Sequence, residues 1–191
     1  MIRVLLVSDR PAIRAGLAQV IDSEPGFRAD VADPSLATAP ASAADVVLLD
    51  SPLAGHEAFQ LCHQLKQLAA PRRVALYSDR TDAEVGVAAW VASADGLVDK
   101  GAPVPMLFEQ LRQVARGGRL LRSPSARALT AAAQELDASE RPVFGMCVYG
   151  VTLDEISRTL RRDPLEVEAT VSALIRRLAR ERVGTRGRSA A

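Results

Sequence analysis

The stretch Asp45-Val46-Val47-Leu48-Leu49-Asp50 decides the fold of this chain. Its four consecutive valines and leucines, bounded by polar residues, are typical of a strand buried on both faces, as the strands of parallel sheets are. A second run of this kind, Val4-Leu5-Leu6-Val7-Ser8, is followed by Asp9. Ligands bind open α/β sheets at the carboxyl ends of the strands, so Asp9 and Asp50 are expected to face one crevice.

Two further strand candidates end in residues that suit the same edge. Ser78 follows the run from Arg73 to Tyr77, and Lys100 follows Gly96-Leu97-Val98-Asp99. Two acids, a hydroxyl and an amine at four strand ends indicate phosphoryl transfer to an aspartate, because this reaction needs positioning and charge neutralisation above all. The sequence therefore predicts a phosphoryl-accepting site at this edge of the sheet.

Helical periodicity follows the strand candidates, as alternating units of strand and helix require. A weaker strand is expected over residues 27–31, and a short or degenerate helix within 33–44. Helices are expected after Asp9, with Pro11 in the first turn, and over residues 57–68, 82–92 and 103–116. Five strands with intervening helices predict an α/β domain with a doubly wound, five-stranded parallel sheet.

The pattern changes at Gly117-Gly118, beyond which only helices are expected. They are predicted over residues 125–135, 139–149, 152–160 and from Asp163 to about Arg182, with Thr152 and Glu155 forming a capping box. A Gly turn and a second turn between the last three helices are typical of a small all-α helix-turn-helix domain. We expect a first domain over 1–118, a linker and connector helix over 119–135, the helix-turn-helix over 136–182 and a disordered tail over 183–191.

Composition limits the class of protein. With 48% hydrophobic and 25% charged residues, the 191-residue chain is typical of a globular protein, and its net charge of +1 requires any DNA-binding surface to be local. Cys62 and Cys147 suggest neither a disulfide framework nor a metal site, and His56 and His63 are expected at the surface or the edge of the core. No apolar stretch is long enough to span a bilayer, so we expect a cytoplasmic protein without membrane contact.

Several motifs together resemble one family. Ser8-Asp9-Arg10-Pro11 is similar to Asp-Asp-His-Pro, and Gly150-Val151-Thr152-Leu153-Asp154-Glu155-Ile156 is similar to Gly-Leu-Ser-Asn-x-Glu-Ile. These motifs resemble those of the NarL/FixJ group of response regulators, in which a flavodoxin-like receiver domain precedes a LuxR-type helix-turn-helix. The resemblance covers nearly the whole chain.

The resemblance implies a role for each residue at the strand ends. Asp50 would accept a phosphoryl group from a sensor histidine kinase, and Asp9 and Asp50 would hold the cofactor Mg²⁺. Ser78 and Lys100 would contact the phosphoryl oxygens, and Leu97 stands at the switch position, where the family usually has an aromatic residue. Ser8 replaces one acid of the usual pair, so Mg²⁺ binding is expected to be weakened.

The resemblance also implies that the second domain binds promoter DNA as a homodimer. Glu166 and Glu168 stand where the family usually has Thr and Lys, respectively, and their charges repel phosphates, although Glu can accept a hydrogen bond from cytosine. The residues expected on the DNA side are Thr152, Glu166, Glu168, Ala169, Thr170, Ser172, Arg176, Arg177 and Arg180.

Two functions remain open at this stage. The first is a DNA-binding transcriptional regulator controlled by phosphorylation of Asp50. The second is an atypical, phosphorylation-independent regulator whose effector domain mainly binds a protein partner, which the two glutamates favour. An enzyme is not expected, because the sequence offers no water-activating base and no substrate pocket beyond the aspartate itself.

Overall fold

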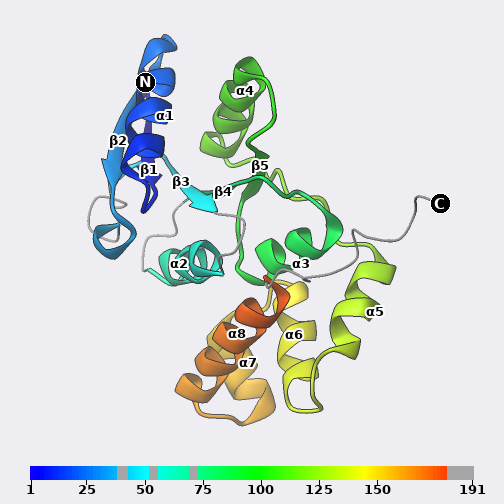
Figure 1. Ribbon diagram of the computed structural model, residues 1–191. Coiled ribbons are helices and arrows are strands. Elements are labelled where there is room, and N and C mark those ends of the chain that lie inside the picture. The colour runs from blue at the N-terminus through cyan, green and yellow to red at the C-terminus, as the bar shows by residue number, and fades with distance from the viewer. Residues whose placement is uncertain (38–42, 52–55, 69–72, 180–191) are drawn as a thin grey trace, which may run out of the picture.

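The computed structural model describes residues 1–37, 43–51, 56–68 and 73–179. Its centre is a parallel sheet of five strands in the order β2-β1-β3-β4-β5 (Figure 1). The strands are β1 (Ile2–Val7), β2 (Phe27–Ala32), β3 (Val46–Ser51), β4 (Val74–Ser78) and β5 (Gly96–Asp99). The predicted doubly wound α/β fold is confirmed, including the weak second strand.

The helices of the first domain agree with the predicted ranges to within a few residues. They are α1 (Pro11–Ser23), α2 (Glu57–Lys66), α3 (Ala83–Val91) and α4 (Val104–Ala115). Between β2 and β3 the short helix predicted in 33–44 is a single 3₁₀ turn, η1 (Pro34–Leu36), because the Asp33 carboxylate accepts the backbone N–H of Ser35 and starts it. Residues 38–42 of that predicted segment lie outside the described residues.

Side chains of β3 alternate between two hydrophobic clusters, one on each face of the sheet. Val46 and Leu48 pack in the cluster that includes residues of α1 and α4. Val47 and Leu49 pack in the cluster on the other face, beneath α2 and α3. This alternation is what a strand with a two-residue side-chain period and two covered faces requires.

The rest of the described chain is helical: α5 (Ala126–Gln134) lies in the predicted connector, and α6 (Glu140–Val148), α7 (Leu153–Leu160) and α8 (Pro164–Leu178) lie in the predicted second domain. Thr152 and Glu155 form the predicted capping box at the start of α7, and the Asp163 carboxylate caps α8. The described part of α8 runs from Pro164 to Leu178, and Ala179 follows it, donating its backbone N–H to the Ile175 carbonyl. Residues 180–182, to which the predicted helix extended, and the predicted tail over 183–191 lie outside the described residues.

The helical domain packs against α2 and α3 rather than standing apart from the α/β domain (Figure 1). Phe144, Ile156, Val167 and Ile175 belong to the same buried cluster as Val47 and Leu49 of the sheet. The hydrophobic core is therefore continuous from one face of the sheet, through α2 and α3, into the helical domain.

Candidate functional site

Asp50 lies near the end of β3 at the carboxyl edge of the sheet, and its side chain has no exposed surface. The preceding run of valines and leucines is buried, so the strand carries this carboxylate into the protein. A buried carboxylate needs hydrogen bonds and opposite charges, because burial alone disfavours its ionised form. The structure supplies them from two chain segments, the one that follows β1 and the one that follows β5.

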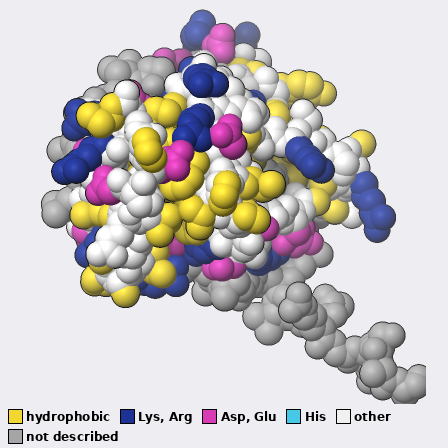
Figure 2. Space-filling view, turned by 90° about the horizontal axis from the view of Figure 1, so that it is seen from above, with side chains coloured by type: hydrophobic (Ala, Val, Ile, Leu, Met, Phe, Trp, Pro, Cys, Tyr) yellow, Lys and Arg dark blue, Asp and Glu magenta, His cyan; other side chains and the backbone are white. Residues whose placement is uncertain are grey.

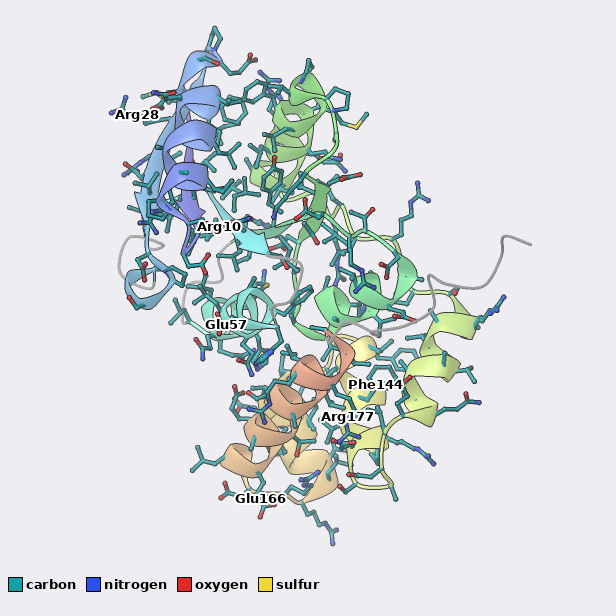
Figure 3. All side chains as sticks on the ribbon, viewed as in Figure 1. Arg10, Arg28, Glu57, Phe144, Glu166 and Arg177 are labelled. Atoms are coloured by element: carbon teal, nitrogen blue, oxygen red, sulfur yellow. The ribbon has the colours of Figure 1, made fainter. Side chains whose placement is uncertain are left out.

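The first of these groups is the guanidinium of Arg10. Its Nη2 donates to both oxygens of Asp50, at 2.7 Å from Oδ2 and 2.9 Å from Oδ1, and its Nε lies 3.2 Å from Oδ2. Arg10 is the N-cap residue of α1, and its side chain is 44% exposed, so it covers the carboxylate from the solvent side. Figure 3 shows Arg10 where the ends of β1 and β3 meet.

The second cation is Lys100, which follows β5. Its Nζ lies 2.7 Å from Oδ1 of Asp50 and 3.0 Å from a carboxylate oxygen of Asp79, and it donates to the backbone carbonyl of Ser51 at 3.0 Å. The ammonium also lies 5.6 Å from the centre of the Tyr77 ring. The structure thus brings Lys100 and Asp50, two of the residues singled out in the sequence, into direct contact.

The two serines of the site have different partners. The Ser8 hydroxyl donates to Asp50 Oδ2 at 2.7 Å and accepts the backbone N–H of Arg10 at 3.1 Å. The buried Ser78 hydroxyl accepts the backbone N–H of Arg80 at 3.1 Å, and Ser78 pairs with Ser51 in the sheet register. The missing acid at position 8 is therefore replaced by a hydrogen-bond donor to Asp50.

The charged partners decide the ionisation of Asp50. Burial raises its pKa, but the hydrogen bonds from Lys100, Ser8 and Arg10, together with the charge of Lys100, outweigh burial and leave the pKa below its usual value. Asp50 is consequently a carboxylate over the physiological range. Its negative charge is matched by two cations within the protein itself.

These contacts leave little room for a metal ion at Asp50. Asp9 is exposed, and together with Asp50 and Glu57 it lines a small pocket beside the strand ends. Within the described residues, no three His, Cys, Asp or Glu side chains are arranged to hold a metal. Both oxygens of Asp50 already accept from N–H or O–H donors. The residues around Asp50 therefore do not fit Mg²⁺ in this arrangement.

Leu97, the expected switch residue, is half-buried in β5 and packs against the cluster that includes α2, α3 and the helical domain. Its place on this face of the sheet connects the Asp50 edge with the interface between the two domains. Arg10 was not singled out in the sequence. The signals for it are its position directly after Asp9, at the same strand end, and the arginine that stands where the resembled motif has a histidine.

A second notable feature is that α8 contacts the α/β domain. The Glu168 carboxylate of α8 lies 3.1 Å from Nε2 of His63 in α2, whose side chain is only 4% exposed. Val167, Val171 and Leu174 of α8 are buried in the shared core. Glu168, expected to face DNA, thus faces the receiver in this conformation.

Trp90 of α3 joins the domains at another point. Its indole Nε1 donates to the backbone carbonyl of Val148 in α6 at 2.8 Å, and the guanidinium of Arg119 in the linker lies 3.7 Å from its ring centre. Receiver, linker and helical domain therefore meet at one side chain. Burial lowers the pKa of Arg119.

The other residues expected on the DNA side are spread over several environments. Arg176 is exposed, whereas Arg177 forms an ion pair with Glu140 at 2.8 Å and donates to the backbone carbonyl of Glu135 at 2.9 Å. Thr152 caps α7 through Glu155. The remaining residues are Thr170, which donates to the Glu166 carbonyl, half-buried Ser172, exposed Ala169 and Arg180, which lies outside the described residues.

The start of α8 is the part of the helix that lies free of the receiver. Leu165 is 79% exposed, and the neighbouring Glu166 is also exposed. Figure 3 places Glu166 at the end of the molecule farthest from the sheet, pointing outward. On the receiver end of the molecule, seen in Figure 2, basic and acidic side chains are interspersed rather than separated by sign.

Comparison with known proteins identifies the family. The model of the response regulator receiver domain matches residues 4–112, more than half of the chain. The chain therefore belongs to the response regulators of two-component systems, in the NarL/FixJ group with a LuxR-type second domain, and the resemblance is confirmed.

Relatives match along most of the chain. The DNA-binding transcriptional activator DevR/DosR of Mycobacterium tuberculosis is 29% identical over 197 residues, covering 95% of this chain and 90% of that protein. A LuxR family DNA-binding response regulator from Silicibacter pomeroyi is 30% identical, with a TM-score of 0.54, and covers 64% of this chain and 98% of that one. The response regulator RcsB, solved in complex with DNA, shares the fold at a TM-score of 0.55 and 16% identity, covering 95% of this chain and 94% of that one.

These relatives are regulators rather than enzymes, in keeping with the expectation from the sequence. Among the described helices, none is both long enough and apolar enough to cross a membrane.

Proposed function

We propose that this chain is a DNA-binding transcriptional regulator that holds its own DNA-reading helix, α8, against the receiver. The observation that carries the proposal is the contact between α8 and receiver helices α2 and α3, with Glu168 beside His63. The order of α6, α7 and α8 supports this assignment, because the second helix of a helix-turn-helix is the one that enters the major groove.

DNA docking and receiver packing compete for the same helix. Glu168 cannot face a groove while it contacts His63 of α2, and α8 as a whole packs against α2 and α3, so promoter binding requires the two domains to separate. A helix that is either packed on the receiver or released from it can couple a signal at the receiver to DNA binding, because the signal shifts the balance between the two states. The conformation described is the closed state.

The control point of the equilibrium between the closed and the open state is Asp50 with the residues that contact it, Ser8, Arg10 and Lys100. Leu97 lies in β5 and Lys100 directly follows it, so a change around the carboxylate is communicated to the face of the sheet covered by α2 and α3, the helices that contact α8. A sensor histidine kinase is the expected partner from family membership, and Asp50 the expected acceptor. The poor fit of a metal at this site favours control that does not depend on Mg²⁺.

Promoter DNA is the partner expected for the open state, bound by a homodimer as in helix-turn-helix regulators generally. Thr152, Ala169, Thr170, Ser172, Arg176 and Arg180 are the residues proposed to approach it. Arg177 is proposed to support the domain through Glu140 rather than to contact phosphate.

Fluorescence anisotropy with the full chain and a labelled fragment of its own upstream region tests the proposal. We expect binding whose affinity falls as salt rises, because released counterions dominate protein–DNA affinity. Exposed Glu166→Lys should strengthen binding to any sequence and steepen the salt dependence. If the wild type, this variant and His63→Glu, which places a second carboxylate against Glu168 to open the domain interface, all fail to bind at low salt, the chain is not a DNA-binding regulator.

A second candidate function, binding of a protein partner by the helical domain, is favoured by the exposed start of α8. Leu165 offers an apolar anchor next to the carboxylate of Glu166, the opposite of a phosphate-binding pattern. Under this function, Leu165→Ala would abolish partner binding, and DNA affinity would be absent at every salt concentration.

A further inference from the structure

The local charge at Asp50 differs from that of the pattern the chain resembles. Ser8 stands in place of an Asp and Arg10 in place of a His. Replacing an acid with a neutral residue raises the net charge around Asp50 by one, because a negative charge is removed. Replacing a neutral histidine with arginine raises it by one more, so the net charge is higher by two. A divalent cation carries the same added charge.

The guanidinium of Arg10 supplies one of these two charges where a metal would have to bind, and the absence of an acid at position 8 accounts for the other. It spans both oxygens of Asp50 with Nη2 and Nε, at 2.7 to 3.2 Å. Fork-shaped contacts between arginine and a carboxylate are strong and fix the orientation of both groups. A metal ion could bind Asp50 only by displacing this side chain, and it would then stand beside two cations, Arg10 and Lys100.

Ser8 and Arg10 form one unit rather than two separate replacements. The Ser8 hydroxyl donates a hydrogen bond to Asp50 Oδ2 and at the same time accepts one from the backbone N–H of Arg10. A carboxylate at position 8 would instead face Asp50 with like charge. The serine therefore both holds Arg10 at the start of α1 and removes the acid that a metal would need.

We propose that Arg10, positioned by Ser8, takes the place of the metal ion, so that Asp50 is neutralised by the chain's own guanidinium and does not bind Mg²⁺. The proposal concerns metal binding alone, and its test is independent of DNA binding. It replaces the expectation that Asp9 and Asp50 hold a weakened Mg²⁺ site.

Isothermal titration with Mg²⁺, repeated with Mn²⁺ followed by electron paramagnetic resonance, tests the proposal on the full chain. We expect no saturable binding by the wild type, nor by Ser8→Asp alone, because Arg10 still covers Asp50. The double variant Ser8→Asp/Arg10→Gln should bind both ions saturably. Arg14→Gln is the matched control, because Arg14 contacts the Ser8 carbonyl and Asp33.

Far-UV circular dichroism and thermal unfolding establish that each variant is folded. If the double variant does not fold, Ser8→Asp/Arg10→His provides a smaller change with the same expected gain of binding. Saturable Mg²⁺ binding by the wild type, with an affinity equal to that of the double variant, would overturn the proposal. So would two folded double variants that bind neither ion.

Discussion

Nε2 of His63 lies 3.1 Å from the carboxylate of Glu168, across 105 residues of sequence. The histidine belongs to α2 of the receiver and the glutamate to α8, the helix expected to read DNA. Nδ1 of His63 is buried and has no hydrogen-bond partner among the described residues. The buried imidazole of His63 therefore has the Glu168 carboxylate as its polar contact among the described residues. Separation of the two domains would expose both side chains to water.

Two adjacent arginines of α8 should behave differently when replaced. Arg177→Ala leaves the carboxylate of Glu140, whose side chain is 8% exposed, without its cation, and should lower the free energy of unfolding by about 1–3 kcal/mol. Arg176→Ala removes an exposed side chain and should change stability by less than about 0.5 kcal/mol. Urea unfolding of the two variants measures the difference.

The same variants separate structural from DNA-contacting roles. Arg176→Ala should weaken binding to all DNA sequences alike, because a phosphate contact carries no sequence information. A loss confined to one sequence, or a stability loss equal to that of Arg177→Ala, would contradict these assignments.

The lowered pKa of Asp50 predicts how Arg10 contributes to stability as pH changes. A carboxylate with a lowered folded-state pKa stabilises the fold fully above its unfolded pKa of about 3.9, and this contribution is lost as pH falls through the folded value. Arg10→Gln should therefore cost about 1–2 kcal/mol near neutral pH, a modest value because Arg10 is half-exposed.

The difference between wild type and Arg10→Gln should remain constant above about pH 5 and shrink in more acidic solution. Urea unfolding at a series of pH values measures it. A difference that is unchanged or larger near pH 3 would mean that the Arg10 contact does not depend on an ionised Asp50.

The sheet could be predicted from the sequence because burial on both faces leaves a strong pattern. The run from Val46 to Leu49 has no polar residue, which only a doubly covered strand tolerates. The same pattern places Asp50 and Lys100 at strand ends, and the structure brings them to 2.7 Å. Local signals also sufficed for the capping box at Thr152.

Arg10 could not be assigned in the same way. A long side chain in a loop can reach several partners, and its direction depends on Ser8, whose hydroxyl holds the Arg10 backbone. The contact between α8 and the receiver could not be predicted from the sequence either. The apolar positions Val167 and Val171 predict a buried helix face but not the element that covers it, and His63 was expected only at the surface or the edge of the core.

The central claim is that the receiver holds α8 away from DNA, and His63→Glu tests it most directly. The substitution places a second carboxylate against Glu168, so repulsion should open the interface. His56→Glu is the matched control, because it puts the same charge at the N-cap of α2, at the opposite end of the helix. Trp90 is the single tryptophan of the chain, and its indole donates a hydrogen bond to the Val148 carbonyl of the helical domain. Opening of the interface breaks this hydrogen bond, so the fluorescence of Trp90 reports it.

The deciding measurement is the affinity of the full-length His63→Glu protein for its own upstream DNA, compared with wild type and His56→Glu at one salt concentration. We predict an affinity at least roughly fivefold higher for His63→Glu, the usual lower range of coupling between two sites, together with a red shift of Trp90 emission. His56→Glu should match the wild type in both respects. A folded His63→Glu protein with a shifted Trp90 emission and unchanged or weaker DNA binding would contradict the claim that the receiver covers the DNA-binding helix.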